Sequence, residues 1–214
     1  MEQSHRDGSA ARLGVSGLEC RRGERSLFSG LAFVVRPGEI VWLRGANGQG
    51  KTTLLRTLAG LSAPEAGAIA WADTPARCPF LYLAHANALK EDLTAAESLR
   101  FLLDLAGEPT MSAELDAALD RFGLANRRRA PVRTLSQGQR RRVALARLAV
   151  PSPPLTWLLD EPFDALDTSG IDTLNALLVE HARRGGSVLL TSHVPLTIAD
   201  PAPAIVQLES PVPA

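Results

Sequence analysis

Eight consecutive residues, GANGQGKT from Gly45 to Thr52, have the composition of a loop that binds phosphate groups. Phosphate oxygens need several hydrogen-bond donors close together and no bulky side chains between them. Glycines at 45, 48 and 50 let the backbone N–H groups point inward, and a helix that begins near Lys51 adds the partial positive charge of its N-terminus. We expect the Lys51 ammonium to reach the β- and γ-phosphates of a nucleotide and the Thr52 hydroxyl to coordinate Mg²⁺.

The segments that flank this loop have the order that a nucleotide-binding loop requires. The apolar run IVWL at 40–43 predicts a buried strand that leads into the glycines, and TTLLRTLAG after the loop has helical periodicity as far as Gly60. A glycine-rich turn that arose by chance would need neither a strand before it nor a helix after it. The sequence therefore predicts a site for ATP and Mg²⁺. The predicted nucleotide-binding residues are Gly45, Ala46, Asn47, Gly48, Gln49, Gly50, Lys51, Thr52 and Thr53.

Two carboxylates, Asp160 and Glu161, follow directly after the apolar run LTWLL at 155–159. An unpaired carboxylate at the end of a buried strand is costly, so alone this pair would be interpreted as a polar turn. Beside a phosphate-binding loop the pair has a chemical use. Asp160 can hold the hydration shell of Mg²⁺, and Glu161 can orient or deprotonate the water that attacks the terminal phosphate. We therefore predict Asp160 as a metal ligand and Glu161 as a catalytic residue.

A third motif, LSQGQ at 135–139, is followed by the arginine-rich run RRRVALARLAV. Ser136 is a good N-cap for the helix that this run predicts, and its hydroxyl and the neighbouring N–H groups form a second site for an anion. The alternative interpretation is an ordinary helix N-cap followed by a solvated, arginine-rich face.

The elements that must position these residues can be read from the alternation of short apolar runs with segments of helical periodicity. This alternation is typical of an α/β fold with a mainly parallel sheet, in which ligands bind at the carboxyl ends of the strands. Between about residues 90 and 150 the strand signal is weak, which predicts a helical lobe inserted into the core. Strands are predicted at 13–20, 31–35, 40–43, 80–83, 155–159, 188–190 and 204–208, and helices after 51, at 93–106, at 112–124, after 136 and at 169–184.

The composition narrows the class of protein. The 214 residues suffice for one domain with its own core, and 23 Lys and Arg balance 23 Asp and Glu, which argues against a nucleic-acid partner. Cys20 and Cys78 are isolated in sequence, so we expect buried, reduced thiols rather than a zinc or redox motif. A polar N-terminus and the lack of an apolar run of about eighteen residues predict a cytoplasmic protein without a membrane-spanning helix.

Five elements, in this order, resemble the ATP-binding subunits of ABC transporters over about residues 13 to 208. They are the phosphate loop, the LSQGQ segment, the acidic pair, the tripeptide ALD at 165–167, and His193 after the strand VLLTS. The resemblance implies a RecA-like P-loop NTPase fold: an α/β core with a mainly parallel sheet, an N-terminal antiparallel β-subdomain and an inserted helical subdomain. It implies a single ATP-binding domain over 1–214, with its core at 13–84 and 151–210 and a helical lobe at about 86–150.

In that family two subunits dimerise head to tail, and each ATP lies between the phosphate loop of one subunit and the LSQGQ-type segment of the other. The resemblance implies a homodimer in which Ser136, Gly138 and Gln139 contact the ATP that the other copy holds. It also implies that His193 contacts the γ-phosphate. The catalytic set is then Lys51, Glu161 and His193.

Two positions depart from the family pattern. An aromatic residue usually stacks on adenine just before a glycine of the first hairpin, but here Arg22 precedes Gly23. Either the guanidinium stacks on the base instead, or this contact is absent. The loop that joins the core to the helical lobe usually begins with a glutamine that senses Mg²⁺, but here His85 follows the strand. His85 either takes over this catalytic and metal-sensing role, with a charge that depends on pH, or is an ordinary loop histidine.

Within the family the chain is most similar to the ATP-binding subunits of the bacterial haem exporter in cytochrome c maturation. This similarity is carried by RSLFSGLAF, YLAH, LKEDLTAAESLRF, LSQGQRRRVALARL and LDEPFDALD. It implies a peripheral protein at the cytoplasmic face of the inner membrane, bound to integral membrane subunits of that system. ATP hydrolysis would drive haem export or release of the haem-loaded periplasmic chaperone. With no Cys-x-x-Cys-His motif, no direct haem binding is expected.

Two other functions stay open at this point. One is export of a different small molecule, since the ATP-binding subunit hardly constrains the cargo. The other is a soluble ATPase of the same superfamily that acts in DNA repair or translation. Those proteins usually carry long coiled-coil insertions or two fused ATPase domains, which this sequence lacks.

Overall fold

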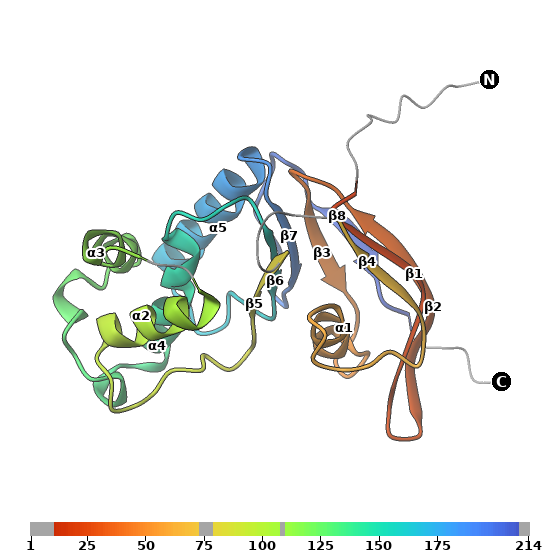
Figure 1. Ribbon diagram of the computed structural model, residues 1–214, viewed down its shortest axis with the longest axis horizontal. Coiled ribbons are helices and arrows are strands. Elements are labelled where there is room, and N and C mark those ends of the chain that lie inside the picture. The colour runs from red at the N-terminus through yellow and green to blue at the C-terminus, as the bar shows by residue number, and fades with distance from the viewer. Residues whose placement is uncertain (1–10, 73–78, 108–109, 210–214) are drawn as a thin grey trace.

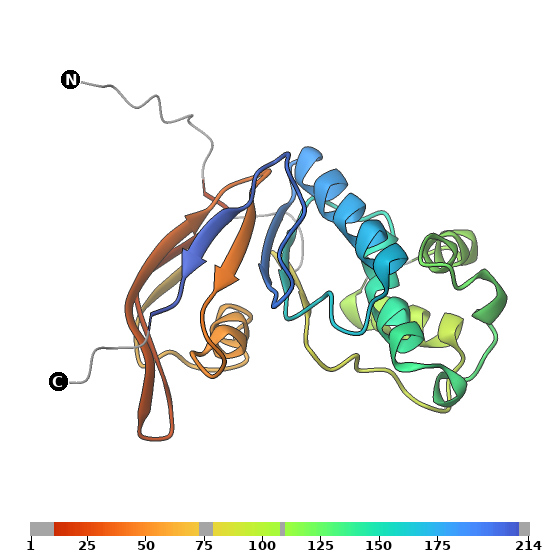
Figure 2. The same cartoon turned by 180° about the vertical axis from the view of Figure 1, so that it is seen from behind.

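The computed structural model describes residues 11–72, 79–107 and 110–209, and it forms two sheets with helices packed around them (Figure 1, Figure 2). The expectations for the chain ends and for Cys78 lie outside the described residues. The elements are β1 (Leu13–Arg22), β2 (Arg25–Val35), β3 (Ile40–Arg44), α1 (Lys51–Leu58), β4 (Ala66–Trp71), β5 (Phe80–Leu83), α2 (Ala95–Ala106), α3 (Ser112–Arg121), α4 (Gln137–Ala146), β6 (Thr156–Leu159), α5 (Thr168–Arg183), β7 (Ser187–Thr191) and β8 (Ala204–Gln207), with short 3₁₀ turns at Ala125–Arg127, Val132–Thr134 and Arg147–Ala149.

A five-stranded parallel sheet with the order β5-β6-β7-β3-β8 forms the centre of the molecule. Successive residues of its inner strands point to opposite faces, and both faces are buried. In β6, Trp157 and Leu159 belong to the core formed with helices α2 to α5, whereas Leu158 belongs to a second core on the other side. Burial on both faces explains why β6 and β7 are continuous apolar runs rather than alternating ones.

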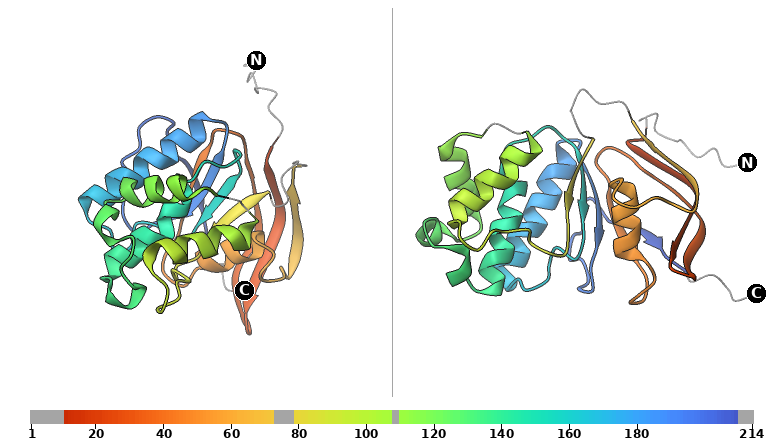
Figure 3. Two further views of the ribbon diagram at one scale, coloured as in Figure 1. Left: turned by 60° about the vertical axis from the view of Figure 1, so that its left-hand side comes forward. Right: turned by 60° about the horizontal axis from the view of Figure 1, so that its bottom comes forward.

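Helix α1 lies between the parallel sheet and a second, antiparallel sheet of order β2-β1-β4 (Figure 3). Its residues Leu54, Leu55 and Leu58 are buried in the second core, together with side chains of both sheets. The helix that begins at the end of the phosphate loop is therefore held from two sides. This packing fixes the direction in which its N-terminus points.

The antiparallel sheet contains the largest differences from the sequence-based predictions. Strand β2 begins at Arg25 rather than at 31, and β4, with the sequence AGAIAW, was not predicted. Alanine and glycine have low strand propensity, so β4 depends on pairing with β1. Gly67 is necessary there, because a Cβ at this position would lie 2.4 Å from the Gly17 carbonyl oxygen.

Helices α2, α3 and α4 lie together at the end of the molecule that is farthest from the antiparallel sheet (Figure 1). Thr94 caps α2 by accepting a hydrogen bond from the Glu97 N–H, and the Glu97 carboxylate accepts one from the Thr94 N–H. The predicted architecture of a parallel core, an antiparallel N-terminal sheet and helices between β5 and β6 is thus present. Among the described residues, no helix combines the length and the apolar character needed to cross a membrane.

A buried histidine lies in the core near the start of β6. The ring of His181 in α5 stacks on Trp157 at 3.7 Å between centroids, and His181 Nε2 donates to the Leu155 carbonyl oxygen at 2.8 Å. Burial lowers the pKa of His181 from 6.5 to about 4, with Arg184 and Arg12 nearby adding to the effect and the bond to Leu155 opposing it. His181 is therefore neutral in the folded protein at neutral pH.

We expect the folded protein to lose stability as the pH falls from about 6.5 towards 4. The unfolded chain binds a proton at His181 in this range and the folded chain does not, because its pKa is lowered. The free energy of unfolding should fall by about 2 kcal/mol between about pH 7.5 and pH 5 from this group. Urea denaturation at both pH values measures this difference in the free energy of unfolding. His181→Phe, which keeps a ring on Trp157, should remove this part of the pH dependence; an unchanged dependence would contradict the assignment.

Candidate functional site

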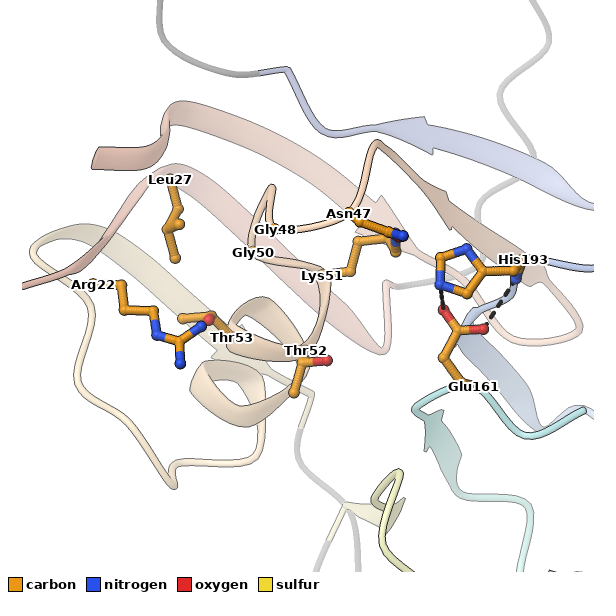
Figure 4. Close-up of a pocket in the computed structure, with 10 residues that line it drawn as sticks. All are labelled: Arg22, Leu27, Asn47, Gly48, Gly50, Lys51, Thr52, Thr53, Glu161 and His193. Atoms are coloured by element: carbon orange, nitrogen blue, oxygen red, sulfur yellow. Dashed lines mark hydrogen bonds and ion pairs between the residues drawn. The ribbon is translucent and has the colours of Figure 1, made fainter. Parts of the chain in front are cut away.

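A pocket of about 280 Å³ lies where the loop after β3 meets the segments that follow β6 and β7 (Figure 4). These segments all follow the carboxyl ends of parallel strands, which is the edge where such sheets bind ligands. One further wall comes from the β1–β2 hairpin. The lining residues are Arg22, Leu27, Asn47, Gly48, Gly50, Lys51, Thr52, Thr53, Glu161 and His193.

Glycine is required at several positions of the loop that carries this pocket. Gly48 and Gly50 have φ values of 80° and 94°, in the left-handed region. A Cβ on Gly50 would also lie 3.0 Å from the Leu27 Cβ, and one on Gly45 would lie 2.6 Å from Gln49 Oε1. The backbone is therefore wrapped closely, as the predicted phosphate-binding role requires.

Two further contacts fix the shape of the loop. The Gln49 side-chain oxygen accepts a hydrogen bond from the Ala46 N–H, which closes a tight turn. Lys51 Nζ donates to the Gly45 carbonyl oxygen at 2.8 Å, so the ammonium group lies across the loop rather than in solvent. The N-terminus of α1 and this ammonium group together give the pocket a positive end.

Asp160 is buried with only 1% of its surface exposed, at the point where β6 ends. Its Oδ1 accepts hydrogen bonds from Thr52 Oγ1 at 3.1 Å and from Thr191 Oγ1 at 3.0 Å. Its Oδ2 is buried and has no partner among the described residues. A buried carboxylate oxygen without a donor is costly unless a cation or water completes its shell.

Glu161 is held in place by the segment after β7. Its N–H donates to Thr191 Oγ1 at 2.8 Å, its Oε2 accepts from the His193 N–H at 3.0 Å, and His193 Nε2 lies 3.4 Å from Oε1 (Figure 4). The backbone of Glu161 has a φ of 46°, in a region that residues other than glycine seldom adopt. This conformation turns the carboxylate towards the pocket, next to Lys51 and His193.

The LSQGQ segment does not line this pocket. Ser136 caps α4, since its Oγ accepts a hydrogen bond from the Gln139 N–H at 3.2 Å and Gln139 Oε1 accepts one from the Ser136 N–H at 3.1 Å. Gly138 lies against the ALD turn, because a Cβ there would be 2.8 Å from the Ala165 carbonyl oxygen. A single chain therefore holds the two predicted phosphate sites apart.

The two residues that depart from the family pattern occupy different places. Arg22 ends β1 and lines the pocket on the hairpin side, near Thr53 (Figure 4). His85 does not line the pocket; its exposed ring lies on the loop after β5, with Nδ1 3.4 Å from Asp164 Oδ2.

Three residues of the site were not found by sequence reasoning. The Thr191 hydroxyl donates to the Asp160 carboxylate and accepts from the Glu161 backbone N–H, and the place of Thr191 two residues before His193 was the available signal. Leu27 forms an apolar part of the pocket wall. Arg141 belongs to the run for which a solvated face was the alternative interpretation, and it is buried against the acidic segment.

Residues 28–164, which contain the phosphate loop, the LSQGQ segment and the acidic pair, match a known family model described as ABC transporter. The chain belongs to the ABC transporter family. Its relatives within the family include proteins named "Cytochrome c biogenesis ATP-binding export protein CcmA". The one from Nitrosomonas europaea is 45% identical over 87% of this chain and 91% of its own length, and the one from Dechloromonas aromatica is 46% identical over 87% and 94%. The relative from Pseudomonas aeruginosa is 47% identical over 83% and 90%. This places the chain in the CcmA branch of the ABC transporter family, and it is an ATPase.

Solved structures agree with this family assignment. A protein described as the ATP-binding subunit of an ABC transporter has a TM-score of 0.73 and 31% identity, covering 85% of this chain and 79% of its own. A putative ABC transporter ATP-binding protein from Pyrococcus furiosus has a TM-score of 0.77 over 92% and 96% at 24% identity, which shows the fold alone. The predicted P-loop NTPase fold is thereby confirmed.

Proposed function

We propose that this ABC ATPase powers haem export in cytochrome c biogenesis, or release of the haem-loaded periplasmic chaperone. The observation that carries the proposal is the identity of 45% to 47%, over more than four fifths of both chains, with relatives that bear the name cytochrome c biogenesis ATP-binding export protein. The exporter's membrane subunits would bind the cargo, so no haem site is expected in this chain. A nucleic-acid partner is not part of the proposal.

Hydrolysis is proposed to take place in the pocket at the ends of β3, β6 and β7. The backbone N–H groups of the loop and Lys51 would hold the phosphates and stabilise the charge that develops on them. Glu161 would orient a water molecule and accept its proton, since its carboxylate faces the pocket. His193 holds that carboxylate through its backbone N–H and would itself contact the γ-phosphate.

Mg²⁺ fits the oxygen atoms of Thr52, which lines this pocket, and of Asp160, which Thr52 contacts. The unpartnered Oδ2 of Asp160 and the adjacent Thr52 hydroxyl are oxygen ligands of the kind that Mg²⁺ prefers. Among the described residues no cluster of three or more His, Cys, Asp or Glu could hold a metal, so the nucleotide phosphates would supply further ligands. Bound there, the ion would neutralise charge on the phosphates. A sensing role for His85 would require its loop to move, because its ring lies beside Asp164.

The working form is proposed to be a homodimer of one-domain chains, each with a core at 13–84 and 151–210 and a helical lobe at about 86–150. Ser136, Gly138 and Gln139 of one copy would complete the site of the other, which agrees with their position outside the pocket of their own chain. Arg22 would lie beside the base. The dimer would bind integral membrane subunits of the cytochrome c maturation system at the cytoplasmic face of the inner membrane.

Deleting the gene in the organism that encodes this chain tests the cargo. We expect the loss of covalently bound haem in c-type cytochromes, measured by haem peroxidase staining of membrane fractions. A plasmid copy of the wild-type chain should restore the stain, and a copy with Glu161→Gln should not. Unchanged staining in the deletion strain would contradict haem export and leave the assignment as an ABC ATPase intact.

A further inference from the structure

Arg141 is a buried arginine on α4 that does not line the nucleotide pocket. Only 3% of its surface is exposed, although burying a charge is costly unless it is paired and hydrogen-bonded. Burial lowers the pKa of its guanidinium, and the carboxylates of Asp164, Asp160 and Glu161 oppose this effect. Neither packing nor helix propensity requires a charged side chain at this position. The contacts of the guanidinium must therefore explain why an arginine is buried here.

One side of the guanidinium binds three successive carbonyl groups of the acidic segment. Arg141 Nη2 donates to the Glu161 carbonyl at 2.7 Å and to the Asp160 carbonyl at 3.1 Å, and Nε donates to the Pro162 carbonyl at 3.3 Å. The middle residue, Glu161, is the one with a φ of 46°. Arg141 therefore holds the uncommon backbone conformation that turns the Glu161 carboxylate towards the pocket.

The other side of the guanidinium binds the loop that follows β5. Arg141 Nη1 donates to the Ala84 carbonyl at 3.2 Å, to the His85 carbonyl at 3.2 Å and to Asn87 Oδ1 at 3.0 Å. One planar group thus connects α4, the acidic segment and the 84–87 loop. The planar fork of arginine suits this task, whereas the ammonium group of lysine is a point donor on a flexible stem.

We propose that Arg141 is a positioning residue for ATP hydrolysis, which holds the Glu161 backbone against α4 and the 84–87 loop. The proposal rests on the proposed role of Glu161 as the residue that activates water. Because α4 begins at the Ser136 cap, the same arginine joins the acidic segment of one site to the LSQGQ segment that would serve the other. A shift of α4 or of the 84–87 loop would then displace the Glu161 carboxylate.

Replacing Arg141 with lysine in the full chain tests this proposal. We expect kcat for ATP hydrolysis to fall about 10- to 100-fold, because a small displacement of a catalytic group has effects of this size. KM should change less than about threefold, since no phosphate-binding residue is altered. Arg141→Gln, which can donate to only part of the carbonyl set, should show the same pattern. Arg12→Lys is the matched control, because Arg12 donates to the Gly185 carbonyl before β7, away from the pocket.

A double-variant comparison separates positioning from a general loss of structure. If Arg141 acts through Glu161, Arg141→Lys should change the residual rate of the Glu161→Gln variant less than about twofold. An equal drop in both backgrounds, or a wild-type kcat in Arg141→Lys while Glu161→Gln is inactive, would overturn the proposal for Arg141 alone. Wild-type hydrolysis by Glu161→Gln would overturn the role proposed for Glu161 and this proposal with it.

Discussion

Glu161→Gln is expected to lower the rate of ATP hydrolysis by about 100-fold or more while ATP binding is kept, because a positioned general base contributes rate factors of this order. Glutamine retains the size of the side chain and an oxygen that accepts from the His193 N–H, a bond of 3.0 Å in the wild-type chain. It cannot take a proton from water. ATP should then hold two copies of the chain together, because hydrolysis no longer separates them. Phosphate release and light scattering with saturating ATP measure the two effects.

Glu180→Gln is the matched control for this experiment. Glu180 lies on α5, where it pairs with Arg121, and it does not line the nucleotide pocket. The rate and the oligomeric state of this variant should equal those of the wild type. If the Glu161→Gln variant remained monomeric with saturating ATP, the dimer mechanism would be wrong.

Lys51→Ala is expected to weaken ATP binding by about 30- to 100-fold, the loss typical of removing one charge-assisted hydrogen bond to phosphate. In the structure the Lys51 ammonium donates to the Gly45 carbonyl at 2.8 Å and lines the pocket, so it is already placed where the phosphates are proposed to lie. Without the Lys51 ammonium, only the N–H groups of the loop backbone would offset the negative charge of the phosphates. Isothermal titration with ATP and Mg²⁺ measures the affinity.

The sequence provides its own control, because its only other lysine is Lys90. The Lys90 ammonium lies 4.2 Å from the centroid of the Phe101 ring on α2 and does not line the nucleotide pocket. Lys90→Ala removes the same positive charge from the chain, and its affinity for ATP should remain that of the wild type. Equal weakening in the two variants would show a general effect of net charge and contradict the role of Lys51.

The fold could be predicted from the sequence wherever a strand or helix was both apolar and bounded by strong turn signals. The strand at 40–43 and the loop after it were found because glycines and Lys51 limit the possible structures. Strand β4 was missed because its three alanines and one glycine become a strand only when β1 pairs with them. Such non-local pairing leaves no local pattern in the chain.

The reactive groups of the site could be predicted from the sequence, but the contacts that support them could not. Asp160 and Glu161 were visible as charges at a strand end, whereas Thr191 joins them only after β6 and β7 lie side by side. Arg141 did carry a signal, since it shares helical spacing with the buried residues Ala144, Leu145 and Leu148. An arginine at such spacing is usually assigned to solvent, and only the six acceptors around it show otherwise.

The His181 ring also constrains how the sequence can diverge. A Cβ on Gly186 would lie 2.2 Å from His181 Nε2, so any larger residue at 186 would collide with the imidazole. Substitutions at the two positions are therefore coupled. A related protein that keeps the histidine must keep the glycine. A related protein with a smaller residue at 181 has room for a larger residue at 186. Both lie near the amino ends of β6 and β7, opposite the nucleotide pocket. Exchange at this pair would be expected to alter thermostability and acid tolerance without altering catalysis.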